Sequence, residues 1–175
     1  WGMISPPRRL GRRGLCLLVI LSWSFLGKTS LATTFQRLTL EQLVREADLI
    51  VLGRVREVTS QESPDRSTIT TTVVLVVKEQ WKGSKVSTIA LKLPGGAAGE
   101  ITQRVMEVPQ FSVGEELILF LKKQKSGHDI TVGGKQGKFT IKSDPQSGRK
   151  MVEDLTGKRQ DQESFLQRLK EIVGN

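Results

Sequence analysis

Cysteine, histidine and tyrosine are nearly absent from this chain of 175 residues. It has one cysteine (Cys16), one histidine (His128) and no tyrosine. A single cysteine excludes an intrachain disulfide, and too few residues of either type remain for a zinc site of several Cys and His ligands. Nucleophilic catalysis needs a base beside the nucleophile. His128 lies in a polar stretch, and its neighbour Asp129 would point to the opposite face of a strand, so we expect a solvated loop histidine.

The acidic residues also lack the spacing of metal ligands. Acidic residues gather in three short clusters: Glu115-Glu116, Glu153-Asp154, and Asp161 with Glu163. None matches a calcium loop. The glycine-rich segment 94–99 lacks phosphate-binding spacing, and no helical pattern follows it. We therefore predict no catalytic residue, no metal ligand and no cofactor.

Residues 1–32 contain no acid but hold five bases: Arg8, Arg9, Arg12, Arg13 and Lys28. The apolar run 15–26 reads LCLLVILSWSFL, shorter than the roughly 20 residues that span a membrane. A basic flank before such a run is typical of a secretory signal peptide, and the small residues Ser30 and Ala32 predict cleavage after Ala32. The alternative is an uncleaved membrane anchor formed by residues 15–26.

The predicted leader accounts for much of the positive net charge of the chain. The whole chain has 27 basic and 18 acidic residues, a formal net charge of +9, which is typical of nucleic-acid binding. Removing the leader's five bases leaves 22 basic and 18 acidic residues, and the net charge falls to +4. We predict an extracytoplasmic protein, secreted or periplasmic. Its expected partner is a protein or an anionic envelope polymer, and a membrane only if the leader is not cleaved.

Helical signals stand at both ends of the remaining chain. Thr39 and Gln42 have the spacing of a capping box, which predicts a short helix over Leu40–Ala47. Near the C-terminus, apolar residues at helical spacing predict an amphipathic helix: Phe165, Leu166, Leu169, Ile172 and Val173. We predict three parts: a signal peptide at 1–32, a β domain at 33–157 and a C-terminal helix at 158–175 that packs on it.

Between the helices, β-type runs alternate with polar turns. The predicted strands cover 49–55, 68–81, 86–93, 101–108, 117–121, 130–132 and 138–142, with a brief pairing at 150–152. Gly53 predicts a bulge, and the continuous apolar run 73–77 predicts cover on both faces. Leu117–Leu121 is the most apolar run after the leader and is predicted to be a central strand. The fold class is mainly β, a small coiled antiparallel barrel with a core of Leu49, Val51, Val55, Val73, Leu75, Ile89, Leu91, Leu117, Leu119, Phe139 and Ile141.

Five short motifs carry a resemblance. They are Ala47–Val55 (ADLIVLGRV), Trp81-Lys82-Gly83, Gly95-Gly96, Pro109–Glu115 with Phe120-Leu121, and Gly133–Phe139 (GGKQGKF). In this order they resemble the netrin-like, tissue-inhibitor-of-metalloproteinase-like OB-fold, and a group of exported bacterial proteins of uncharacterised role. The resemblance spans about residues 40–142 and implies an OB-like coiled antiparallel barrel.

The resemblance also implies a function that this chain does not match. The inhibitors of that fold clamp a catalytic zinc with an N-terminal cysteine and are stapled by disulfides. The chain after Ala32 has no cysteine, so we assign no inhibitory residue.

We predict an exported non-catalytic binding or interaction module of unknown ligand. The predicted partner contacts are Trp81, Lys122, Lys123 and Lys125. One alternative is a protease-inhibitor-like or enzyme-associated domain of the cell envelope. The other is a single-strand nucleic-acid-binding OB domain, for which a basic face would be needed; its candidates are Lys122, Lys123, Lys125, Lys135, Lys138 and Lys142.

Overall fold

The computed structural model describes residues 1–2, 37–125 and 127–174. The chain divides into Trp1–Gln36 and a compact unit, Arg37–Asn175. Apart from its first two residues, the predicted leader lies outside the described residues, as do its cleavage after Ala32, the alternative anchor at 15–26 and Cys16. In the part that the structure describes, no helix combines the length and the apolar character that crossing a bilayer requires.

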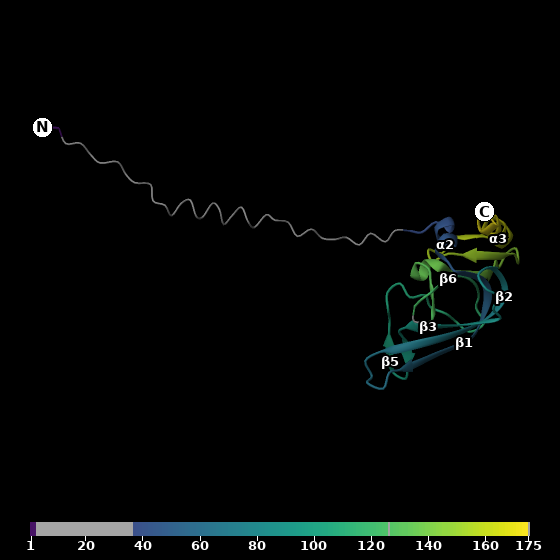
Figure 1. Ribbon diagram of the computed structural model, residues 1–175, viewed down its shortest axis with the longest axis horizontal. Helices are drawn as coiled ribbons and strands as arrows, with labels where there is room; N and C mark the ends of the chain where they lie inside the picture. The colour runs from purple at the N-terminus through teal and green to yellow at the C-terminus, as the bar shows by residue number, and fades with distance from the viewer. Residues whose placement is uncertain (3–36, 126, 175) are drawn as a thin grey trace. The chain divides into compact units, whose positions relative to one another are not determined.

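The compact unit is mainly β with a C-terminal helix, as the sequence predicts (Figure 1). Its elements are α2 (Leu40–Glu46), β1 (Leu49–Glu62), β2 (Ile69–Lys82), β3 (Thr88–Pro94), β4 (Gly96–Ala98), β5 (Ile101–Gln103), β6 (Glu116–Lys123), β7 (Asp129–Thr131), the 3-10 helix η1 (Gly134–Gly137), β8 (Lys138–Ser143), β9 (Lys150–Glu153), β10 (Arg159–Asp161) and α3 (Gln162–Gly174). The C-terminal helix thus begins at Gln162, after the short strand β10, which the sequence analysis does not predict.

The strands form one large antiparallel sheet and one small hairpin. The order in the large sheet is β10-β9-β8-β6-β1-β2-β3, and β7 pairs with the end of β6. β4 and β5 pair only with each other. The hydrogen-bonded ladders do not close the sheet into a barrel, although β3 and β7 come into contact.

β1 and β2 form a hairpin much longer than the predicted strand 49–55. Pairing continues to Glu62, which lies opposite Ile69. The register shifts between Leu52 and Gly53, so the predicted bulge at Gly53 is confirmed. A Cβ at this position would lie 2.9 Å from the carbonyl oxygen of Val76, which explains why glycine stands there.

The run Leu117–Leu121 is the central strand β6, and all five side chains are fully buried. Alternate residues of β6 enter two different cores. Ile118 and Phe120 face the helices, and the three leucines face the other side of the sheet. Because Leu49–Leu52 of β1 alternate in the same way, this part of β1 and β6 are covered on both faces.

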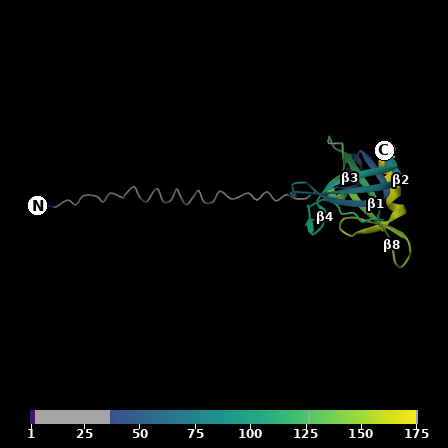
Figure 2. The ribbon, with the colours of Figure 1, turned by 90° about the horizontal axis from the view of Figure 1, so that it is seen from below.

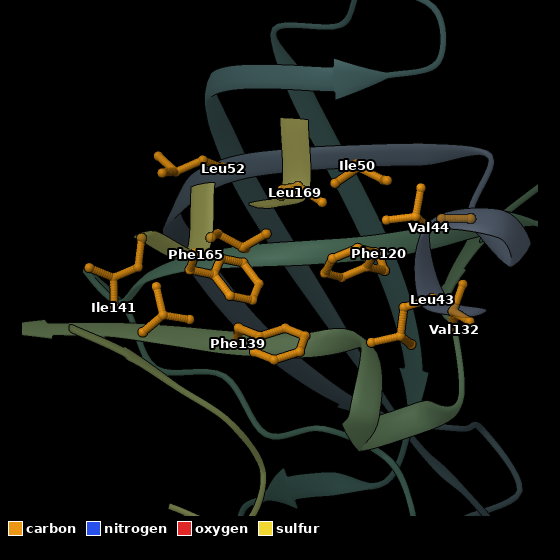
Figure 3. Packing of buried hydrophobic residues seen from close by; sticks show 13 residues of the cluster. Leu43, Val44, Ile50, Leu52, Phe120, Val132, Phe139, Ile141, Phe165 and Leu169 are labelled. Atoms are coloured by element: carbon orange, nitrogen blue, oxygen red, sulfur yellow. The ribbon is translucent and has the colours of Figure 1, made fainter. Parts of the chain in front are cut away.

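The helix-side core contains a chain of aromatic rings (Figure 3). Phe139 on β8 lies 5.6 Å from Phe120 and 5.1 Å from Phe165 of α3, measured between ring centroids. Leu169 and the α2 residue Leu43 complete the cluster that joins both helices to the sheet.

The second core lies on the opposite face and consists mainly of aliphatic side chains from β1, β2, β3 and β6. All eleven predicted core residues are buried, but they do not share one interior. Nine belong to this second core, whereas Phe139 and Ile141 pack against the helices. The predicted double cover of 73–77 is wrong, because Val76 is 39% exposed.

Both helices follow from local signals. In α2 the Gln42 N–H donates to Thr39 Oγ1 and the Thr39 N–H donates to Gln42 Oε1, so the predicted capping box is confirmed. In α3, Phe165 and Leu169 are the buried members of the predicted stripe. Figures 1 and 2 place both helices at one end of the compact unit and the β4–β5 hairpin at the other.

Candidate functional site

The candidate site is a cavity at the end of the compact unit that carries the β4–β5 hairpin. β6 begins at Glu116, opposite Arg54, whereas β1 continues to Glu62 with no β6 residue beside it. The inner face of the β1–β2 hairpin is therefore not covered by β6 beyond Arg54. A cavity of about 250 Å³ remains there, and we call it the hairpin groove; its lining includes Val58, Ser60, Thr71, Leu93, Val105 and Phe111.

Two hydroxyl groups are fixed in the lining of the hairpin groove. Ser60 and Thr71 are directly paired across β1 and β2, so their side chains stand side by side. Their oxygens lie 2.8 Å apart, and Thr71 Oγ1 donates to the carbonyl oxygen of Gly95 at 2.6 Å. These bonds hold both side chains in place.

Glycine is required where β4 passes these hydroxyls. Gly96 has a φ of +137°, and a Cβ there would lie 2.1 Å from Thr71 Oγ1 and 2.5 Å from Ser60 Oγ. Only a residue without a side chain allows this close approach.

Gln103 joins the small hairpin to the large sheet. Its Oε1 accepts a hydrogen bond from the Ile69 N–H at 2.7 Å, and the Gly95 N–H donates to the Ile69 carbonyl oxygen at 2.7 Å. β4 and β5 thus have a fixed position over the hairpin groove although they pair with no strand of the large sheet.

Lys138 supports the wall formed by Gln110 and Phe111. Its Nζ donates to the Gln110 carbonyl oxygen, forms an ion pair of 2.7 Å with Glu115 Oε1, and lies 4.8 Å from the centre of the Phe111 ring. The Lys138 side chain is only 13% exposed. This lysine therefore has a structural role behind the wall.

Exposed apolar side chains lie at and next to Val105, which lines the hairpin groove. Val105 is 36% exposed and the neighbouring Met106 is 83% exposed. Ile101, on β5, is 49% exposed. In the loop that follows β5, Glu107 has a φ of +65°, and its carbonyl oxygen occupies the place that a Cβ of Gly134 would take. Glu107 thus lies against Gly134, the first residue of η1.

No ionisable side chain is found among the described residues that line the hairpin groove. The carboxylates with shifted pKa values lie outside this lining. Burial tends to raise the pKa of Glu116, but hydrogen bonds from Lys78 (2.9 Å) and Lys150 (3.1 Å) outweigh it and lower the pKa. The described lining of the groove is therefore uncharged, with a few polar groups among apolar side chains.

The residues predicted as partner contacts lie elsewhere. Trp81 is half-buried against the helix-side core. Lys122 and Lys123 are exposed at the end of β6, and Lys125 is exposed in the turn before β7. None of the four lines the hairpin groove. Their role in partner contact stays a prediction.

Two of the six lysines considered for a basic face are bound to carboxylates. Lys138 pairs with Glu115, and Lys142 pairs with Glu153. His128 is exposed in the turn between β6 and β7. Over the described ranges, no group of three or more His, Cys, Asp or Glu residues stands ready to hold a metal ion.

Sequence reasoning missed the hairpin groove. It treated residues 94–99 only as a glycine-rich segment without phosphate-binding spacing, and residues 68–81 only as a predicted strand. The available signal was the pair Gly95-Gly96 shortly after a strand, which marks a close approach of two backbones. The chain matches no protein-family model, and comparison with curated proteins finds no matching relative.

Proposed function

We propose that this chain is an exported, non-catalytic binding module that holds its ligand in the hairpin groove. The observation that carries the proposal is the combination of apolar walls, two fixed hydroxyls and the exposed apolar side chains of Val105, which lines the groove, and of its neighbour Met106. Ligand sites typically join apolar walls with a few fixed polar groups. Contiguous exposed apolar side chains mark surfaces that a partner covers.

The proposal includes an OB-like arrangement of the strands. The order β3-β2-β1-β6-β8, the contact between β3 and β7, and the motif resemblance support it. In this arrangement the hairpin groove is the mouth of a coiled sheet, a common position for ligands.

The proposal also includes export by the leader. The mass of the protein recovered outside the cytoplasm tests this part. Loss of residues 1–32 is expected. A mass that includes residues 15–26, together with recovery in the membrane fraction, would instead establish the anchor.

Binding in the groove is testable with Nile red, a neutral dye whose fluorescence rises in apolar surroundings. The full chain is titrated as wild type and as the variants Val105→Gln and Val76→Gln. The two valines have similar exposure, 36% and 39%, but only Val105 lines the groove. We expect Val105→Gln to weaken dye binding at least fivefold and Val76→Gln to change it less than twofold.

Equal effects of the two substitutions, or no dye binding by the wild type, would overturn the groove as the binding site. Circular dichroism of each variant confirms that the fold is retained, so that a loss of binding reports on the groove itself.

A further inference from the structure

The hydroxyl pair in the hairpin groove has a fixed direction of donation. Thr71 has one hydroxyl proton, which it gives to the Gly95 carbonyl oxygen at 2.6 Å. The hydrogen bond between Ser60 and Thr71, at 2.8 Å, must therefore use the proton of Ser60. Ser60 Oγ is left with lone pairs only, so it presents a hydrogen-bond acceptor to the groove.

Gln103 presents the complementary group. Its Oε1 accepts from the Ile69 N–H, which fixes the orientation of the side-chain amide. Its Nε2 carries two N–H groups, and the described chain offers them no acceptor. The groove thus contains one fixed acceptor and one fixed donor between apolar walls.

We propose that the ligand of the hairpin groove is an extended peptide segment with an apolar residue; this rests on the proposed function. A backbone N–H of the segment donates to Ser60 Oγ, and a backbone carbonyl accepts from Gln103 Nε2. The apolar side chain lies against Val105 and Phe111. A hydrocarbon chain offers neither polar group and would leave Ser60 and Gln103 without partners, which is costly when they are covered.

Charge adds a requirement on the segment. In the sequence Arg104 lies between the lining residues Gln103 and Val105; it is exposed and forms no ion pair in the described chain. The nearest acid in the loop, Glu107, lies against Gly134 and does not line the groove. We therefore expect an acidic residue beside the apolar one in the bound peptide, where it complements the unpaired guanidinium.

A library of random twelve-residue peptides displayed on phage, panned against the full chain, provides the probe. A synthetic fluorescein-labelled peptide with the enriched consensus is then titrated by fluorescence anisotropy. We expect Ser60→Ala to weaken binding at least fivefold and Arg104→Gln at least threefold. Ser87→Ala and Arg149→Gln are exposed controls outside the groove, and they should change binding less than twofold.

Backbone methylation of the peptide tests the acceptor directly. Peptides N-methylated at one amide at a time are titrated against wild type and Ser60→Ala. We expect one position at which methylation weakens binding to the wild type but has no further effect on Ser60→Ala. Independence of methylation and the Ser60 substitution at every position would overturn the assigned hydrogen bond.

The outcomes separate the two proposals. Dye binding that depends on Val105, without any enriched peptide, would overturn the peptide inference and leave the groove as a binding site. An enriched peptide that binds Ser60→Ala and Arg104→Gln as tightly as wild type would overturn the inference as well. Absence of both dye and peptide binding would overturn the inference and the proposed function together.

Discussion

At the scale of single residues, Gly96 shows how closely two parts of the chain approach. The position combines a φ of +137° with two hydroxyl oxygens inside the space of a Cβ. Both the backbone conformation and the contact exclude other residues, because an L side chain rarely adopts this φ and the hydroxyls are held by hydrogen bonds.

Gly96→Ala is therefore expected to lower the free energy of unfolding by about 1–3 kcal/mol, since it strains the backbone and displaces Ser60 and Thr71. Gly99→Ala is the matched control: Gly99 also has a positive φ, +60°, but nothing lies within 4 Å of a Cβ there. Urea unfolding of the two variants measures the difference. Equal decreases in the free energy of unfolding would mean that the close contacts at Gly96 do not contribute to the effect.

The sequence predicts which residues are buried better than it predicts what covers them. Phe139 and Ile141 have the alternation of an inward strand face, and both are buried. The layer opposite them includes Phe165 of α3, which joins the sheet only in three dimensions. Alternation identifies one face of a strand, but it carries no information about the layer opposite that face. For the same reason Ser60 and Thr71 are not recognisable as a pair before the register of β1 and β2 is known.

At the scale of elements, Glu153 connects three strands. It lies on β9 and forms ion pairs with Lys142 of β8 and with Arg159 of β10, the latter at 2.7 Å. The hydrogen bond from Lys142 and then that from Arg159 lower the pKa of Glu153 below its ordinary value of 4.5. β10 has only three residues, so these side chains add to a short ladder.

Because the folded-state pKa of Glu153 is lowered, its contribution to stability is present above pH 4.5 and is lost as the pH falls through the folded-state pKa. Glu153→Gln is expected to destabilise the protein by about 0.5–1 kcal/mol at pH 7 and to have a smaller effect at pH 3. Urea unfolding at both pH values measures this. Glu100→Gln, at an exposed position, should change stability at neither pH; a loss of equal size at pH 3 and pH 7 for Glu153→Gln would rule out the charge as its cause.

α3 covers the helix-side core mainly through Phe165 and Leu169. Phe165→Ala removes a ring that packs 5.1 Å from Phe139. We expect a loss of about 3–5 kcal/mol in the free energy of unfolding, since the ring leaves a cavity. Gln167→Ala, on the exposed side of α3, should change stability by less than about 0.5 kcal/mol. If the two substitutions have similar effects, α3 does not close this core.

Elements with strong local signals are predicted well; of the short strands, β4 and β10 are missed, and β5 covers only the first three residues of the predicted strand 101–108. The capping box at Thr39 and the apolar run of β6 are local properties, so both elements appear as expected. β4 and β10 have three residues each and form only because a partner strand lies beside them. The distal part of β1, from Glu57 to Glu62, is polar in sequence and is a strand because it pairs with β2.

At the scale of the whole molecule, two cores share the walls formed by β1 and β6. A change in one core is therefore felt by the strands that bound the other. The β4–β5 hairpin contributes to neither core, and its two strands pair only with each other. Stability is expected to be unevenly distributed along the chain.

Hydrogen exchange of the full chain, followed by mass spectrometry, tests this distribution. Amides of Leu49–Val55 in β1 and of β6 should exchange only through global unfolding, whereas those of β4 and β5 should exchange much faster through local opening. Phe165→Ala should accelerate exchange in β1 and β6 together and leave the rate in β4 and β5 nearly unchanged. Protection of β4–β5 equal to that of β6 would contradict the expected local opening.

The double cover of β6 has a consequence for how its register is encoded. In a strand with one wet face, a slip by one residue puts apolar side chains into water, and polarity alone forbids it. Leu117–Leu121 is apolar on both sides, so a slip by one residue would only move each of its side chains from one core to the other. Polar side chains oppose such a slip only at the ends of the strand. Glu116 forms ion pairs with Lys78 and Lys150 at one end, and Lys122 is exposed to solvent at the other. Within the strand, the register is set by side-chain volume. The Phe120 ring fits only the side where Phe139 lies, so this one bulky side chain determines which way the central strand faces.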